Sequence, residues 1–281
     1  MRFNREVFFS YVRRAPFGGR LTQQQVDGMT DMLDYVEENT QVLNDIREIA
    51  YNFATTYHET GARMIPVRET FANSTAQAVA RLDKAWARGR LPQVRAPYWR
   101  DGWFGRGRNQ ATHERNYQKI ERETGIAATR NPDLLLDSKT DCRVLFPGNS
   151  QGWWTGKRLP DYFNATTNDP VGARAVVNGT DKAKHIGENI YPAFLGAFKA
   201  AETKTELPAD VSPEAAEPDG VEHWYNSTTI ISAIGGVVSA GGASFIAAIN
   251  NPFSLIFLVA ALGFAAWIIR ERMRHAYEKG V

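Results

Sequence analysis

The chain has 281 residues, of which 43% are hydrophobic and 23% are charged, values that are ordinary for a globular protein of one or two domains. The single cysteine, Cys142, excludes an internal disulfide and favours a reducing compartment or a fold that needs no such bridge. We expect Cys142 to be a small buried apolar residue, and nothing in the sequence argues for a catalytic thiol there.

The formal net charge of +2 conceals an uneven distribution along the chain. Residues 202–223 carry a net charge of −6, residues 224–269 carry none and residues 270–281 carry +2, which leaves +6 on residues 1–201. A basic body of this kind suits an anionic polymer as substrate. We expect no nucleic-acid partner.

The amino terminus, "MRFNREVFFSYVRRAPFGG", has interspersed charges. It lacks the apolar run and the small-residue cleavage site of a signal peptide. We therefore expect the chain to be made in the cytoplasm and not to be exported by that route.

Residues 1–201 are predicted to be mainly helical, with at most a small sheet, because no stretch alternates convincingly between apolar and polar residues. In "LTQQQVDGMTDMLDYVEEN", Thr22 and Gln25 have the spacing of a capping box at a helix start. Apolar residues at spacings of three and four predict the next helix from about residue 40 to Gly61, and a further one closes at Gly89. Other helices are expected at about 112–124, 136–146, 170–178 and 180–201.

The C-terminal part is predicted to be a linker followed by a membrane anchor. Residues 202–227 are acidic and rich in Pro and Ala, which indicates a disordered, flexible linker. The uncharged run after it predicts a transmembrane helical hairpin, 228–249 and 253–269, with the turn signal "NNP" between the spans. The basic tail, 270–281, should stay in the cytoplasm, and two spans then keep the body there too. A single span would place the body outside; we favour the hairpin.

Small residues recur every four positions in the first predicted span, at Gly235, Ser239 and Ala243 and at Ser232, Gly236 and Ala240. This pattern lets two membrane helices approach closely and self-associate. The alternative is an apolar anchor without a specific partner, and the sequence leaves both open.

Two glutamates in "YHETGARMIPVRET" are the candidate chemical groups. Glu59 falls in the last turn of a largely apolar helix, where the helix dipole and burial both disfavour a charged carboxylate, so we expect a raised pKa and a general acid. Glu69 follows in a loop beside Arg68, whose charge should keep it ionised as a base. The alternative is two solvated surface glutamates. A zinc site is not expected, because position 62, where a second histidine would be needed, is Ala62.

Four stretches, "AYNFATTYHETGARMIPVRE", "WFGRGRNQATHERNY", "NPDLLLD" and "DPVGARAVVNGTDKAKHIG", occur in an order that resembles the catalytic domain of glycoside hydrolase family 19. That family contains plant-type chitinases and many bacteriophage endolysins, and the opening "FGGRLTQQQVDGM" is more similar to the endolysin branch. The resemblance covers about residues 5–200 and implies a mainly α, lysozyme-like α+β domain. It departs from the family at Ala62, at "WFGRG" and at His185.

The resemblance implies roles for six residues. Glu59 would be the general acid, Glu69 the base that activates a water, and Thr112 the hydroxyl that helps to hold this water. Gln110, Asn116 and Asn178 would bind the sugar or orient the site. An inverting mechanism follows, with the two carboxyls roughly 6.5–9.5 Å apart. The residues alone leave simpler interpretations open: Thr112 as a helix N-cap, Asn116 as a solvent-facing residue and Asn178 as a helix stop.

The resulting hypothesis is an endolysin that cuts β-1,4 bonds of peptidoglycan, without metal or organic cofactor, and is held at the host inner membrane with its catalytic domain in the cytoplasm until lysis. One alternative is a chitinase. Another is a holin-like protein in which the hairpin makes the membrane lesion, a hypothesis that expression of residues 224–281 alone would test. A third alternative is a cell-wall enzyme that is carried in the virion.

Overall fold

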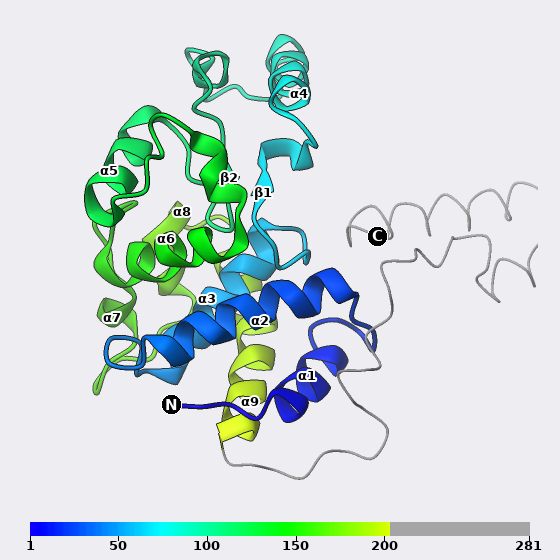
Figure 1. Cartoon of the computed structure of the whole chain (residues 1–281), viewed down its shortest axis with the longest axis vertical. Coiled ribbons are helices and arrows are strands. Elements are labelled where there is room, and N and C mark those ends of the chain that lie inside the picture. Colours follow the sequence, from blue (N-terminus) through cyan, green and yellow to red (C-terminus); the bar gives the residue numbers. More distant parts are fainter. Residues whose placement is uncertain (203–281) are drawn as a thin grey trace, which may run out of the picture. The chain divides into compact units, whose positions relative to one another are not determined.

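A computed structural model describes residues 1–202, which form a mainly helical body (Figure 1). Residues 203–281 lie outside this description. The predicted linker at 202–227, apart from its first residue, and the predicted hairpin at 228–269 also lie outside the described residues. Within residues 1–202, no helix is both long enough and apolar enough to cross a lipid bilayer.

The elements of this body follow one another in a simple chain order. The α-helices are α1 (Arg5–Arg14), α2 (Gln23–Glu38), α3 (Ile46–Glu59), α4 (Thr75–Ala87), α5 (Glu114–Thr124), α6 (Ser138–Gln151), α7 (Leu159–Tyr162), α8 (Ala175–Asn178) and α9 (Tyr191–Glu202). Short 3-10 helices are η1 (Glu69–Phe71), η2 (Tyr98–Asp101), η3 (Pro132–Leu136) and η4 (Gly172–Arg174), and a π-helical turn, η5 (His185–Ile190), precedes α9. The sequence allows at most a small sheet, and the sheet consists of β1 (Val67–Arg68) paired antiparallel with β2 (Arg106–Gly107).

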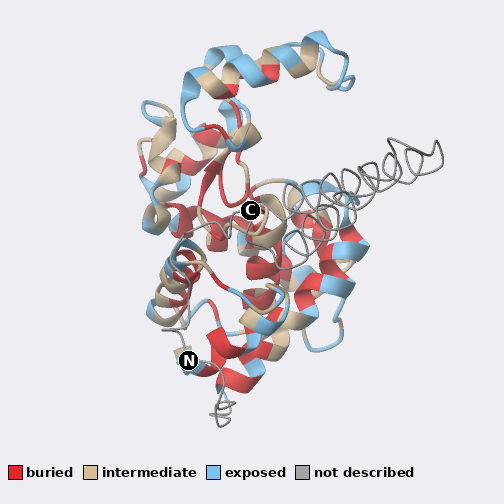
Figure 2. Ribbon diagram, turned by 90° about the vertical axis from the view of Figure 1, so that its right-hand side faces the viewer, coloured by how far each residue is buried: buried red, intermediate tan, exposed pale blue. Residues whose placement is uncertain are grey.

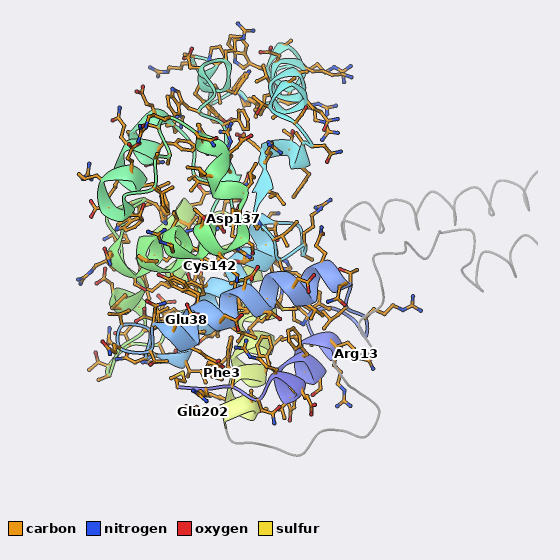
Figure 3. The ribbon with its side chains drawn as sticks, viewed as in Figure 1. Phe3, Arg13, Glu38, Asp137, Cys142 and Glu202 are labelled. Atoms are coloured by element: carbon orange, nitrogen blue, oxygen red, sulfur yellow. The ribbon has the colours of Figure 1, made fainter. Side chains whose placement is uncertain are left out.

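The main core is formed where α1, α2, α3, α6 and α9 pack together, with α9 lying against both α1 and α3. Aromatic side chains from three helices meet at its centre: the ring of Phe198 lies 4.8 Å from Phe8 and 5.0 Å from Phe53, measured between centroids. Cys142 is free and buried, as the sequence predicts, and Figure 3 places it on α6 in the middle of the body. This core fixes the end of α3, which carries Glu59.

Two smaller clusters extend the body away from this core. One lies under α5 and α6 and includes Tyr117, Ile120 and Leu135. The other joins α4 to η2 through Leu82, Trp99 and neighbouring apolar residues. Figure 2 shows α4, at the top of the view, with mainly exposed and intermediate residues, whereas the main core is buried. The α4 region is therefore held by a small local cluster.

The structure confirms the predicted helix start at Thr22 but corrects the start or the length of three other predicted helices. The capping box of Thr22 and Gln25 is present at the start of α2. The helix expected from about residue 40 begins six residues later, because the Asp45 side chain accepts from the backbone N–H of Arg47 and Val42 is 76% exposed in a turn. The helix expected at 170–178 is only the short pair η4 and α8, and the one expected from 180 begins as a π-helical turn at 185.

Glu48, in the first turn of α3, is a half-buried carboxyl that makes stability depend on pH. Burial raises its pKa to about 7, the charge of Asp45 adds to this, and the Ser150 hydroxyl, 3.4 Å from Oε2, opposes it. The folded state therefore binds the Glu48 proton more tightly than the unfolded state does, and this contribution to stability is lost as the pH rises from about 4.5 to about 7.

Glu48→Gln should consequently gain stability relative to the wild type as the pH rises. We expect the difference in unfolding free energy between variant and wild type to shift by about 1–2 kcal/mol in favour of the variant between pH 4.5 and pH 8, after allowance for solvent screening. Urea denaturation of the full chain at both pH values measures it, with the exposed Glu38→Gln as control. A pH-independent difference for Glu48→Gln would contradict the expectation.

Candidate active site

Glu59 ends α3 and is joined to a buried arginine from the far side of the sequence. Arg174 Nη1 donates to Glu59 Oε1 over 2.6 Å, with the Arg174 side chain 2% exposed and the Glu59 side chain 17% exposed. Arg174 Nε donates to the backbone carbonyl of Asp181 over 2.9 Å. The guanidinium thus fixes the Glu59 carboxyl in one direction.

The Arg174 guanidinium is a charged neighbour of Glu59 that the sequence argument did not include. It lies at hydrogen-bond distance and forms a charge-assisted bond with the carboxyl. Arg174 was missed as a site residue because it lies 115 residues from Glu59 and no local spacing links them. Its only signal is its place in "DPVGARAVVNG", one of the stretches of the family resemblance.

Glu69 lies directly after β1 and is held by groups other than the one expected. Tyr98 Oη donates to Glu69 Oε1 over 3.0 Å, and the backbone N–H of Gly105 donates to Oε2 over 2.7 Å. The expected cation, Arg68, instead pairs with Asp133 at 2.7 Å, so it is not the hydrogen-bond partner that holds Glu69. The carboxylate is therefore oriented by two neutral donors, one of them backbone.

Three of the predicted site residues converge on Gly105. A Cβ placed on Gly105 would lie 2.8 Å from Gln110 Oε1, 3.4 Å from Glu69 Oε2 and 3.4 Å from Thr112 Oγ1. Any side chain at position 105 would displace the Gln110 carboxamide, so the glycine is required by this close approach. The structure thus brings Glu69, Gln110 and Thr112 together.

The loop that follows β2 presents Gln110 and Thr112 in fixed orientations. Gln110 has a left-handed backbone, with φ 52°, and its Nε2 donates to the carbonyls of Val67 and Gly107, each over 2.8 Å. The Thr112 hydroxyl donates to the Gln110 carbonyl over 2.8 Å, which leaves the lone pairs of the hydroxyl oxygen free to accept. Such strained backbone is common at functional sites.

The structure gives a different outcome for each of the three simpler interpretations of Thr112, Asn116 and Asn178. Thr112 is not a helix N-cap: α5 begins at Glu114, and its N-cap residue is His113. Asn116 is half-buried and donates to the Thr112 carbonyl over 2.6 Å, so it holds the backbone of Thr112 in place. Asn178 ends α8 with an exposed side chain that no described hydrogen bond joins to the other site residues.

Two buried arginines hold the β2 loop in place. Arg106 is 3% exposed and pairs with Asp133 at 2.6 Å. Arg108 is fully buried and pairs with Asp141 of α6 at 2.9 Å. Both contacts are structural, and they connect the loop to the body.

Neutral aromatic groups border Glu69. Burial, with a further contribution from the Glu69 charge, raises the pKa of Tyr98, so this hydroxyl keeps its proton and donates to the carboxylate. Burial, assisted by the Arg115 charge, lowers the pKa of His113, whose ring lies 4.6 Å from that of Tyr98 between centroids. His113 is therefore neutral at pH 7.

A surface hollow with a volume of about 870 Å³ adjoins the Glu69 group. It shares Tyr98 and Thr112 with that group. The other lining residues come mainly from the segment before η2; they are Gln93, Val94, Arg95, Ala96, Pro97, Arg100, Asp101 and His113. A ligand in this hollow would lie beside Tyr98 and Thr112.

Within residues 1–202, no group of three or more His, Cys, Asp or Glu side chains is arranged to hold a metal ion. Comparison of the chain with known protein families, with curated proteins and with solved structures finds no match. The resemblance of the four motifs to glycoside hydrolase family 19 therefore stays a prediction.

Proposed function

We propose that residues 1–202 form an inverting glycoside hydrolase with a lysozyme-like α+β fold, which cuts β-1,4 bonds of peptidoglycan for host cell lysis. The observation that carries the proposal is the meeting of the Glu69 carboxylate, the Thr112 hydroxyl and the Gln110 carboxamide at Gly105. Two solvated surface glutamates, the simpler interpretation, do not account for a carboxylate held by both Tyr98 and a backbone N–H.

The Glu69 group is suited to hold and activate a water molecule. Both Glu69 Oε2 and Thr112 Oγ1 can accept a hydrogen bond, because the Thr112 proton is already donated to Gln110. A water that donates one hydrogen to each has its oxygen lone pair directed away from both, toward a bound sugar. Glu69 then takes the proton as the oxygen attacks the anomeric carbon.

Glu59 is the proposed general acid, and Arg174 is its positioning residue. As the acid, Glu59 must carry its proton beside the Arg174 guanidinium in the complex with the glycan. The glycosidic oxygen then receives the Glu59 proton as the bond breaks. The predicted separation of the two carboxyls, roughly 6.5–9.5 Å, leaves space for the attacking water.

Thr112 provides a graded test of the water-holding role. Thr112→Val removes the acceptor without changing the side-chain volume greatly, and we expect kcat to fall by about 10–100-fold because the water loses one of its two orienting partners. Thr112→Ser keeps the hydroxyl and should retain most activity. Release of reducing ends from purified sacculi measures both; equal activity of the Val and Ser variants would exclude this role.

We also propose membrane attachment, which is supported only by the sequence of residues 228–269. The hairpin would hold the enzyme at the host inner membrane, with the body in the cytoplasm, until the membrane is breached. No cofactor takes part in the proposed chemistry.

The experiment that tests the function is product analysis with the full chain in a neutral detergent. Sacculi and neutral β-1,4-linked N-acetylglucosamine oligomers are digested in parallel, and the anomeric form of each new reducing end is followed by proton NMR. We expect cleavage of sacculi with the α-anomer formed first, since inversion converts a β-bond. Cleavage of the oligomers alone would favour a chitinase, and first formation of the β-anomer would exclude the inverting mechanism.

A further inference from the structure

The hollow beside Glu69 is lined mainly by the C-terminal end, residues 93–101, of a basic segment, residues 75–101, which we call the arm. The arm consists of α4, the loop after it and η2, and it is held by its own apolar cluster around Leu82 and Trp99. It contains six basic and two acidic residues and so carries +4 of the +6 found on residues 1–201. Much of the net positive charge of the body is thus carried by the arm, and two of its bases, Arg95 and Arg100, line the hollow.

Only part of this charge is neutralised within the body. Arg100 lines the hollow, but its Nε binds Asp83 Oδ1 at 2.9 Å and its guanidinium lies over the Trp86 ring. Arg95 also lines the hollow, is exposed, and takes part in none of the ion pairs formed within residues 1–202. Asp101 is the one carboxylate among the residues that line this hollow. Arg95 is therefore the cation available to a ligand there.

We infer that the hollow binds carboxylate groups carried by the peptide substituents of the glycan strand, with Arg95 as their partner. The inference rests on the proposed function, because it assumes a glycan that passes Glu69 and Thr112 into the hollow they border. A guanidinium matches a carboxylate with two parallel hydrogen bonds, and an exposed one is free to reorient toward it. A neutral β-1,4 glycan has no group of this kind, so the arm selects peptidoglycan.

The test compares one substrate in two charge states. Sacculi with free carboxylates and the same sacculi after amidation with carbodiimide and methylamine are digested by the full chain, and the ratio of kcat/KM on the two is measured. We expect Arg95→Gln to lower this ratio about three- to fivefold, the size typical of one exposed ion pair. Arg88→Gln is the matched control: it removes the same charge from the arm, but Arg88 does not line the hollow, so the ratio should stay at the wild-type value.

Several outcomes would overturn the inference. An unchanged ratio for Arg95→Gln, or an equal decrease for Arg88→Gln, would mean that the arm acts only through its overall charge. An equal loss, in Arg95→Gln, of binding to anionic phospholipid vesicles and to sacculi would mean that the arm faces a membrane. If the wild type cleaves neither substrate, the proposed function fails. Co-sedimentation of the wild type, Arg95→Gln and Arg88→Gln with untreated and amidated sacculi then tests the inference separately, and an unchanged preference for untreated sacculi in Arg95→Gln would overturn it.

Discussion

Glu59→Gln should lose nearly all hydrolysis of peptidoglycan, with turnover lower by about a thousandfold, because a general acid typically contributes 10²–10⁴ to the rate. The carboxamide cannot donate the proton that the departing glycosidic oxygen needs. It can still accept the hydrogen bond that Arg174 Nη1 donates at 2.6 Å, so the buried guanidinium keeps a partner. We therefore expect the variant to fold as the wild type does.

The measurement is the initial rate of reducing-end release from sacculi, with circular dichroism as the test of folding. Glu38→Gln, an exposed substitution of the same kind on α2, is the control and should retain full activity. A Glu59→Gln protein that is folded and within tenfold of the wild-type rate would end the assignment of Glu59 as the acid. The proposed mechanism would then have no proton donor.

The sequence predicts well those features that depend on neighbouring residues. Thr22 and Gln25 form their capping box because both partners lie within one helical turn. Gly89 lies just beyond α4 with φ 68°, a conformation that glycine adopts without a Cβ penalty. The small size of the sheet follows from the lack of alternating stretches, and β1 and β2 have two residues each.

The parts of the site that the sequence did not reveal are contacts between distant segments. Glu69 is 29 residues from Tyr98 and 36 from Gly105, so the local argument, which considered only the neighbouring Arg68, did not reveal the two groups that hold the carboxylate. Arg68 and Arg106 instead share Asp133, a pairing created when β1 and β2 come together. Which charge neutralises which is decided by tertiary packing, and periodicity carries no information about it.

Among the substitutions considered, the loss of the Arg108 side chain should lower the free energy of unfolding most. Its guanidinium binds Asp141 at 2.9 Å, the Ser138 hydroxyl at 2.6 Å and the Met64 carbonyl at 3.0 Å, and it also reaches the Gly28 carbonyl at 3.2 Å. One buried side chain thus joins α2, the loop after α3 and the start of α6 to the turn that carries Gln110 and Thr112.

Arg108→Met should lower the free energy of unfolding by about 3–5 kcal/mol, because it leaves the carboxylate of Asp141 buried without its partner. The double variant Arg108→Met/Asp141→Leu removes both charges and should recover much of the loss, since apolar replacements of a buried pair are often tolerated. Urea denaturation of the full chain compares the three proteins. If the double variant is no more stable than Arg108→Met, the unpaired charge is not the cause, and the lost hydrogen bonds to the Met64 and Gly28 carbonyls would account for the destabilisation.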